Sequence, residues 1–226
     1  MDTQQRNEST YYSWHYPQYG ETTDRSSQGF RRPARGKRKT NRSCGIFFSV
    51  LVASNVDYLL AKRRWGIEFI DIPMEEVYCL FYQIKDDDIG YEASVFANRA
   101  IACREGTPED LLKAMRLYQA VKIICEKKKL DAVTLSCFSL IEKLGTTGCL
   151  ALALLNDEGI PAGCEGDLQS IFTLLIAKTL TGQAGFMANP AFINDDQNEI
   201  VMAHCTIATK WWISLSSGII LKRRPG

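Results

Sequence analysis

Histidine is scarce in this 226-residue sequence, which contains only His15 and His204. The eight cysteines include no Cys-x-x-Cys pair, so the usual ligand spacing of a structural zinc site is missing. The sequence also lacks a signal-peptide pattern at its start and an apolar run long enough to cross a bilayer. We therefore expect neither a zinc module nor a membrane protein, and scattered thiols without a secretion signal predict a reducing, cytoplasmic location.

Net charge is also small, +1 in total, but it is unevenly distributed. Residues 1–45 carry nine basic and four acidic residues, whereas the remainder carries 18 basic and 22 acidic residues. This first segment has few aliphatic residues and no regular period, so we predict a disordered, basic and polar tail. Its run RRPARGKRKTNR is compatible with an anionic surface, but a solvated arm is the favoured interpretation, and nucleic acid is not expected as a partner.

Apolar runs and helical periods alternate from Ile46 onwards. Strands are predicted at 46–54, 66–73 and 130–138, a short strand or loop at 160–167, and a final pair of strands at 184–192 and 198–208. Helices are predicted at 55–65 (capped by Asn55), 74–88, 107–129 (capped by Thr107), 148–159 and 168–182.

This alternation predicts an α/β fold, in which a parallel sheet of Rossmann-like type carries helices on both faces. The last two strands have no helix between them, which indicates a change to antiparallel structure near residue 184. We divide the chain into a tail (1–45), an α/β domain (46–183) and the start of a mostly antiparallel β domain (184–226).

Two carboxylates stand where the strand 160–167 leads into a long apolar helix. Ligands collect at the carboxyl ends of parallel strands, so Glu165 and Asp167 are candidate catalytic residues. Gly163 and Gly166 flank Glu165 and allow the backbone to approach a ligand closely. Asp167 also occupies the position of a helix N-cap, and the sequence leaves its capping and catalytic roles equally open.

Together with other hard donor atoms, these two carboxylates predict a site for a divalent metal ion. His204 and Asn189 supply imidazole nitrogen and amide oxygen, so Glu165, Asn189 and His204 are the candidate ligands for Mn²⁺ or Mg²⁺. The alternatives are a hydrogen-bonded core histidine for His204 and a turn residue before Pro190 for Asn189. Cys137 and Cys164 are possible nucleophiles, but a Cys–His hydrolase is disfavoured because the folded part of the chain has no second histidine to activate them.

Three segments carry a resemblance to a known family. CEGD before an apolar helix, then TGQAGFMANP and then HCTIA resemble the L-fucose isomerase-like branch of the fucose/arabinose isomerase family. The resemblance also includes LVASNVDYLLAKRRWGIEFIDIPMEEVY and LSCFSLI, and it runs from about Leu51 to Lys210.

The resemblance implies a metal-dependent aldose–ketose isomerase of carbohydrate metabolism, usually with Mn²⁺, that assembles as a trimer or hexamer and binds a sugar. It implies that Glu165 is a ligand and acid/base, and that Cys137, Asn189 and His204 lie at the substrate. Asn189 falls where the family has an Asp, and an amide can coordinate a metal but cannot shuttle a proton. If Asp167 does not take that role, the alternative is a non-catalytic or truncated remnant that binds sugar or partner subunits without turnover.

The resemblance stops after Lys210, at WWISLSSGIILKRRPG. Relatives carry a further metal-binding histidine beyond this point. A shift of one base at the Trp211–Trp212 codons permits a histidine-containing continuation of that kind. We therefore hypothesise a one-base frame slip after about residue 210, which sequencing of the coding DNA would test.

Overall fold

The computed structural model describes residues 42–47, 52–103, 106–210 and 219–221. The predicted tail, except for residues 42–45, and the segment of the proposed frame slip, except for 219–221, lie outside the described residues. The chain forms two compact units. Of the described residues, one unit contains those up to 187 and those from 205 onwards, which we call the α/β unit, and the other contains 188–204.

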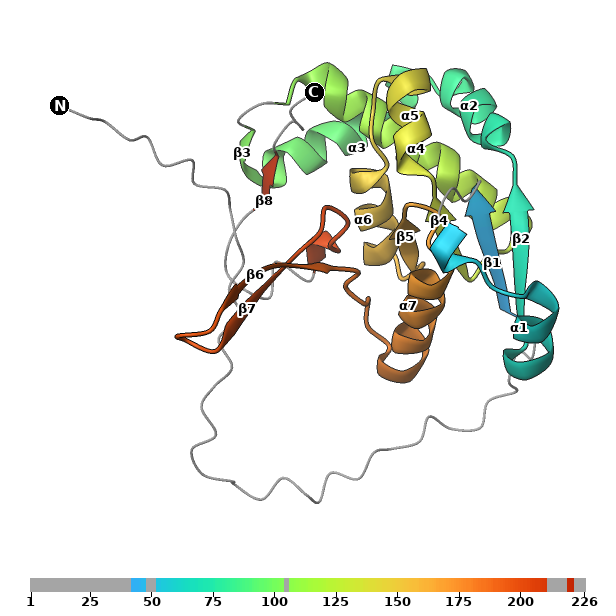
Figure 1. Ribbon diagram of the computed structural model, residues 1–226. Coiled ribbons are helices and arrows are strands. Elements are labelled where there is room, and N and C mark those ends of the chain that lie inside the picture. Colours follow the sequence, from blue (N-terminus) through green and yellow to red (C-terminus); the bar gives the residue numbers. More distant parts are fainter. Residues whose placement is uncertain (1–41, 48–51, 104–105, 211–218, 222–226) are drawn as a thin grey trace. The chain divides into compact units, whose positions relative to one another are not determined.

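A four-stranded sheet, in the order β2–β1–β4–β5, forms the centre of the α/β unit (Figure 1). All of its pairings are parallel. The four strands are β1 (Arg42–Phe47), β2 (Ile67–Ile72), β4 (Ala132–Leu135) and β5 (Ala162–Cys164). The predicted α/β fold class is therefore confirmed.

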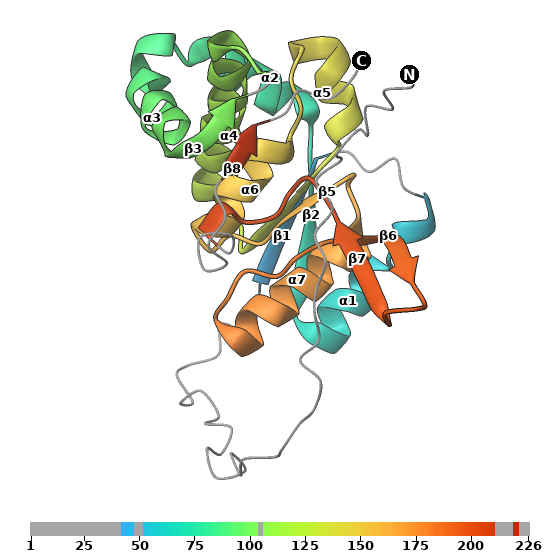
Figure 2. The same ribbon diagram turned by 90° about the vertical axis from the view of Figure 1, so that its left-hand side faces the viewer.

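Helices cover both faces of this sheet, because its strands are apolar on both sides. Phe47, Val133 and Leu135 pack with α2, α4, α5 and α6 on one face. Ile46 and Phe69 pack with α1 and α7 on the other. Figure 2 shows α1 and α7 next to each other. The helices are α1 (Tyr58–Trp65), α2 (Met74–Gln83), α3 (Asp86–Arg99), α4 (Pro108–Lys128), α5 (Cys137–Leu144), α6 (Cys149–Asp157), α7 (Leu168–Thr181) and the short 3₁₀ helix Val52–Ser54.

The helix ends show how local chemistry fixes these boundaries. Thr107 caps α4 as predicted, and its hydroxyl accepts a hydrogen bond from the Asp110 N–H. Gly182 ends α7 in the left-handed conformation, as the sequence predicts. The predicted cap of α1 is wrong: Asp57, not Asn55, accepts the hydrogen bond from the Leu60 N–H. A carboxylate two residues later therefore starts the helix.

Three other expectations need correction. β1 begins at Arg42, so residues 42–45 belong to the sheet and not to the tail, and the strand ends at Phe47. The predicted strand 130–138 ends at Leu135, because Cys137 already begins α5. The single helix predicted at 74–88 is interrupted, since α2 ends at Gln83 and α3 starts at Asp86.

Residues 188–204 contain an antiparallel hairpin of β6 (Asn189–Asn194) and β7 (Glu199–Ala203), which confirms the predicted antiparallel pair. Residues 205–210 return to the α/β unit, where Asp157 at the end of α6 accepts hydrogen bonds from the Thr209 hydroxyl and the Lys210 N–H. A separate parallel pair joins β3 (Ala100–Cys103) to β8 (Ile219–Leu221). Within the described segments, no helix is both long and apolar enough to cross a membrane.

Candidate functional site

The strand order creates a topological switch point between β1 and β4. From β1 the chain goes to β2 on one side, and β4 then pairs on the other side of β1. Ligands of open α/β sheets bind at such a point, outside the carboxyl ends of the strands. The described residues that follow these ends are the Val52–Ser54 turn after β1, Ser136 and Cys137 after β4, and Glu165 after β5. Glu165, the candidate acid, therefore lies at the carboxyl edge of the parallel sheet, as predicted.

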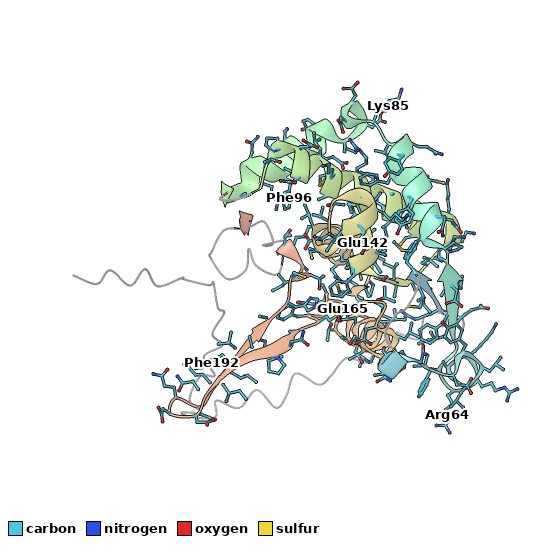
Figure 3. The ribbon with its side chains drawn as sticks, turned by 45° about the horizontal axis from the view of Figure 1, so that its top comes forward. Arg64, Lys85, Phe96, Glu142, Glu165 and Phe192 are labelled. Carbon is cyan, nitrogen blue, oxygen red and sulfur yellow. The ribbon has the colours of Figure 1, made fainter. Side chains whose placement is uncertain are left out.

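Glu165 occupies an unusual backbone conformation at this edge. Its φ angle is 65° and that of Gly166 is 68°, so two successive residues adopt the left-handed region. A side chain with a Cβ disfavours this region by about 1 kcal/mol or more, and functional sites often hold such residues. The carboxylate is half-buried in the turn between β5 and α7 (Figure 3). The turn thus presents Glu165 at the sheet edge at a local conformational cost.

Asp167 is the N-cap of α7, so the capping role left open by the sequence is confirmed. Its Oδ1 accepts hydrogen bonds from the Ser170 N–H at 2.9 Å and from the Ser54 hydroxyl at 2.5 Å, and its Oδ2 accepts one from the Ser170 hydroxyl at 2.7 Å. Ser54 is itself buried and accepts a hydrogen bond from the Leu168 N–H at 2.7 Å. A catalytic role for Asp167 stays a prediction that none of these contacts supports.

Ser54 is the residue of this edge that the sequence did not single out. It lies 113 positions before Asp167 along the chain, and no local pattern marks it. Through it, the turn after β1 is tied to the start of α7, which follows β5. Ser54 is therefore a positioning residue for the loop that carries Glu165.

Burial alone would raise the pKa of Asp167, but the hydrogen bonds from Ser170 and Ser54 outweigh it and hold that pKa below its usual value. A carboxyl group with a lowered pKa stabilises the folded state at pH values above its unfolded pKa. The stabilisation is lost as the pH falls from about 3.9 through the lower folded pKa. Asp167 thus contributes to stability across the neutral range.

Replacing Asp167 by alanine is expected to lower the free energy of unfolding at pH 7 by about 1–2 kcal/mol, because the first turn of α7 loses its cap. Asp167→Asn is the matched variant, since its amide oxygen can still accept the bonds made to Oδ1, while its amide nitrogen cannot accept the one from the Ser170 hydroxyl. Urea unfolding of the wild type and both variants at pH 7 and pH 3.5 measures the loss of stability and its dependence on pH. A wild-type advantage over Asp167→Ala that stays constant between these pH values contradicts an ionised cap.

Cys137, predicted to lie at the substrate, is buried where β4 passes into α5. Its thiol accepts a hydrogen bond from Cys164 at 2.9 Å. This bond lowers the pKa of Cys137; burial opposes the change, while the N–H groups of Glu165 and Gly148 favour it. The same contact and burial raise the pKa of Cys164. Contact between Cys137 and substrate stays a prediction.

Asn189 and His204 lie at the same end of the β6–β7 hairpin. Asn189 is the first residue of β6 and pairs with Ala203, the last residue of β7, and His204 follows directly. Asn189 is exposed and His204 is half-buried. The hairpin register therefore brings two of the three predicted ligands together, while their approach to Glu165 stays a prediction.

Comparisons with known proteins identify relatives of one kind. The chain is 31% identical over 114 residues to a sulfoquinovose isomerase of Clostridium sp. (strain MSTE9), a match covering 50% of this chain and 26% of that protein. It is 22% identical over 163 residues to the sulfoquinovose isomerase of Priestia aryabhattai, covering 71% and 35%. A third, from Alkalicoccus urumqiensis, is 28% identical over 94 residues, covering 41% and 20%.

These matches support a relationship to sugar isomerases. They do not single out the L-fucose isomerase-like branch, which stays a prediction, and no family model matches the chain. The matched stretch spans 26% and 35% of the lengths of the Clostridium and Priestia aryabhattai proteins.

Proposed function

We propose that this chain contributes the α/β part of an aldose–ketose sugar isomerase. The observation that carries the proposal is Glu165, an acid held in a left-handed turn at the carboxyl edge of the sheet. Similarity to sulfoquinovose isomerases supports the same reaction class and makes sulfoquinovose the first substrate to test.

In this proposal Glu165 moves the proton between the two carbons that exchange oxidation state. It removes the proton next to the open-chain carbonyl, which gives an ene-diol, and the proton returns to the neighbouring carbon. Ser54 and Asp167 act as positioning residues, since their hydrogen bonds fix the end of the turn that carries Glu165.

A divalent cation fits the donors that the sequence singles out. A carboxylate, an amide oxygen and an imidazole nitrogen, from Glu165, Asn189 and His204, are hard or intermediate ligands that suit Mn²⁺ or Mg²⁺. If bound by these residues, such an ion would supply Lewis-acid chemistry, which polarises a carbonyl oxygen and offsets developing negative charge. We propose these three residues as the ligand set.

The experiment is Mn²⁺-dependent proton exchange on the purified chain. The protein is incubated with sulfoquinovose in deuterated water, and deuterium at the carbon next to the carbonyl is followed by NMR. We expect exchange that requires Mn²⁺ and rises in the Asn189→Asp variant, because a carboxylate binds a cation more tightly than an amide. Mn²⁺ binding without exchange in either protein would favour the sugar-binding alternative and contradict the proposed isomerisation.

The cytoplasmic location and the homo-oligomeric assembly remain proposals that accompany this function. Light scattering of the purified chain gives its assembly state directly. A trimer or hexamer would agree with the expectation drawn from the family resemblance.

A further inference from the structure

Four cysteines of the α/β unit lie in two close pairs. The Sγ atoms of Cys137 and Cys164 are 2.9 Å apart, and those of Cys149 and Cys205 are 3.0 Å apart. Cys205 also interacts with Cys164, and this interaction, after that with Cys137, raises the pKa of the Cys164 thiol. The sulfur atoms therefore form a continuous series in the order Cys137, Cys164, Cys205 and Cys149.

The fold explains why these residues meet. Cys164 pairs in register with Leu135 across β4 and β5, and Cys137 begins the helix after β4. A Cβ atom added at Gly148 would lie 2.9 Å from the Cys137 sulfur, so glycine lets the start of α6 approach this thiol. Cys149 is the next residue.

Accessibility differs sharply along the series. Cys137 and Cys164 are buried, with 6% and 4% of their surfaces exposed. Cys149 is intermediate, and Cys205 is exposed. A reagent in solution therefore reaches Cys205 first.

The sulfur separations favour disulfide chemistry over a zinc site. Two thiolates that share a tetrahedral zinc ion, at Zn–S distances of about 2.3 Å, lie about 3.8 Å apart. Both pairs are closer than that. A disulfide needs about 2.05 Å, so each sulfur must move by only ~0.4 Å along the line between them.

We propose that these cysteines form a thiol–disulfide relay, in which an outer pair, Cys149 and Cys205, passes oxidation to an inner pair, Cys137 and Cys164. The oxidant is a low-molecular-weight disulfide. The disulfide exchange itself does not require the proposed isomerase reaction, so it can be tested without any isomerase activity.

The steps balance as ordinary thiol–disulfide exchange. The Cys205 thiolate attacks the small disulfide and releases one small thiol, and Cys149 then attacks the Cys205 sulfur and releases the second. Two electrons thus pass from the protein to the small disulfide, whose released thiols take up two protons. Cys164 next attacks the Cys205 sulfur and expels Cys149. Cys137 finally attacks Cys164 and expels Cys205, which leaves the outer pair reduced and ready to react again.

The relay ends beside the candidate acid. Cys164 immediately precedes Glu165, and the Glu165 N–H donates a hydrogen bond to the Cys137 sulfur. Closing the inner disulfide moves the Cys137 sulfur, which accepts this hydrogen bond. The turn that carries Glu165 therefore moves as well. If the proposed isomerase function is correct, oxidation lowers its rate and a dithiol restores it.

Disulfide mapping of the full chain tests the relay without any activity measurement. The reduced protein is treated with oxidised glutathione, quenched with N-ethylmaleimide at intervals and digested without reduction for mass spectrometry. We expect the Cys149–Cys205 link first, then the Cys137–Cys164 link, and a final loss of four hydrogens from the intact mass.

Variants separate the relay from general oxidation. Cys205→Ser, at an exposed position, is expected to slow formation of the inner link at least about tenfold. In Cys149→Ser no outer link can form, so glutathione is expected to accumulate on Cys205 until Cys164 displaces it. Cys79→Ser is the control, because Cys79 is an exposed thiol on α2 outside the series.

Three results would overturn the proposal. An inner link that forms as fast in Cys205→Ser as in the wild type excludes the relay. Links to Cys79 in the same yield as the proposed pairs indicate unselective oxidation. A stoichiometric zinc ion that blocks both links assigns the thiols to metal binding.

Discussion

Replacing Glu165 by glutamine is expected to reduce Mn²⁺-dependent deuterium incorporation into the sugar by at least about 10²-fold. General acid–base groups contribute effects of this size or larger, and an amide of the same shape cannot carry the proton. Glutamine also keeps the side-chain length, and the turn already accommodates a Cβ at this left-handed position. The fold should therefore survive while the chemistry is lost.

Glu142→Gln is the matched control for this experiment. Glu142 is an exposed glutamate on α5, shown with Glu165 in Figure 3, and its replacement is expected to leave exchange unchanged. Thermal unfolding of both variants separates loss of chemistry from loss of fold. If the Glu165→Gln variant keeps the exchange rate within about threefold of the wild type, then Glu165 carries no general acid–base step.

The second large effect concerns stability and involves Asn156, a buried polar residue of α6. Its side-chain amide donates to the carbonyl of Leu152 at 3.0 Å and to that of Ala162 at 2.8 Å. Its Oδ1 accepts from the Ala162 N–H at 3.0 Å. Among the described strands β5 is the last of the sheet, so Asn156 satisfies backbone groups on the side of β5 where no described strand pairs.

Asn156→Ala is expected to lower the free energy of unfolding by about 2–4 kcal/mol. The substitution leaves the buried N–H and C=O of Ala162 without partners, and each such loss costs about 1–3 kcal/mol. Urea unfolding followed by circular dichroism measures the effect. Asn55→Ala, at an exposed position before α1, should change stability by less than about 0.5 kcal/mol. Equal effects of the two substitutions would contradict the role assigned to Asn156.

Helices and strands whose ends are marked by clear capping or boundary residues in the sequence were predicted correctly. α4 has a threonine cap, an early proline, acids in its first turn and lysines in its last, and it lies where the sequence places it. β2 and α7 are also flanked by clear boundary residues, with Gly66 before the strand and Gly182 after the helix. In these segments local chemistry and tertiary packing favour the same structure.

The errors arise where packing or charge overrides the apparent pattern. β1 was placed too late because residues 1–45 were treated as one segment with few aliphatic residues and no regular period. A Cβ at Gly45 would lie 2.4 Å from Leu130 Cδ1, so only a small residue fits this strand position. Asp88 was assigned to the end of a helix, but its carboxylate accepts a hydrogen bond from the Lys85 N–H and starts α3. Acids favour the beginning of a helix, not its end.

Only those parts of the candidate site that depend on local sequence were predicted. The turn that carries Glu165 and the cap at Asp167 follow from a strand–helix boundary. The contact with Ser54 and the sulfur series depend on pairing between distant segments, which no local pattern encodes. The common position of Asn189 and His204 requires the hairpin register.

The amide of Asn156 has one more consequence for the behaviour of the protein in concentrated solution. An uncovered edge strand offers backbone donors and acceptors to strands of other molecules, which promotes aggregation. At Ala162 both groups are already occupied by a side chain of the same molecule. β5 is also buried along its length, so burial and the Asn156 amide together leave no backbone group at Ala162 free to pair with a strand of another molecule.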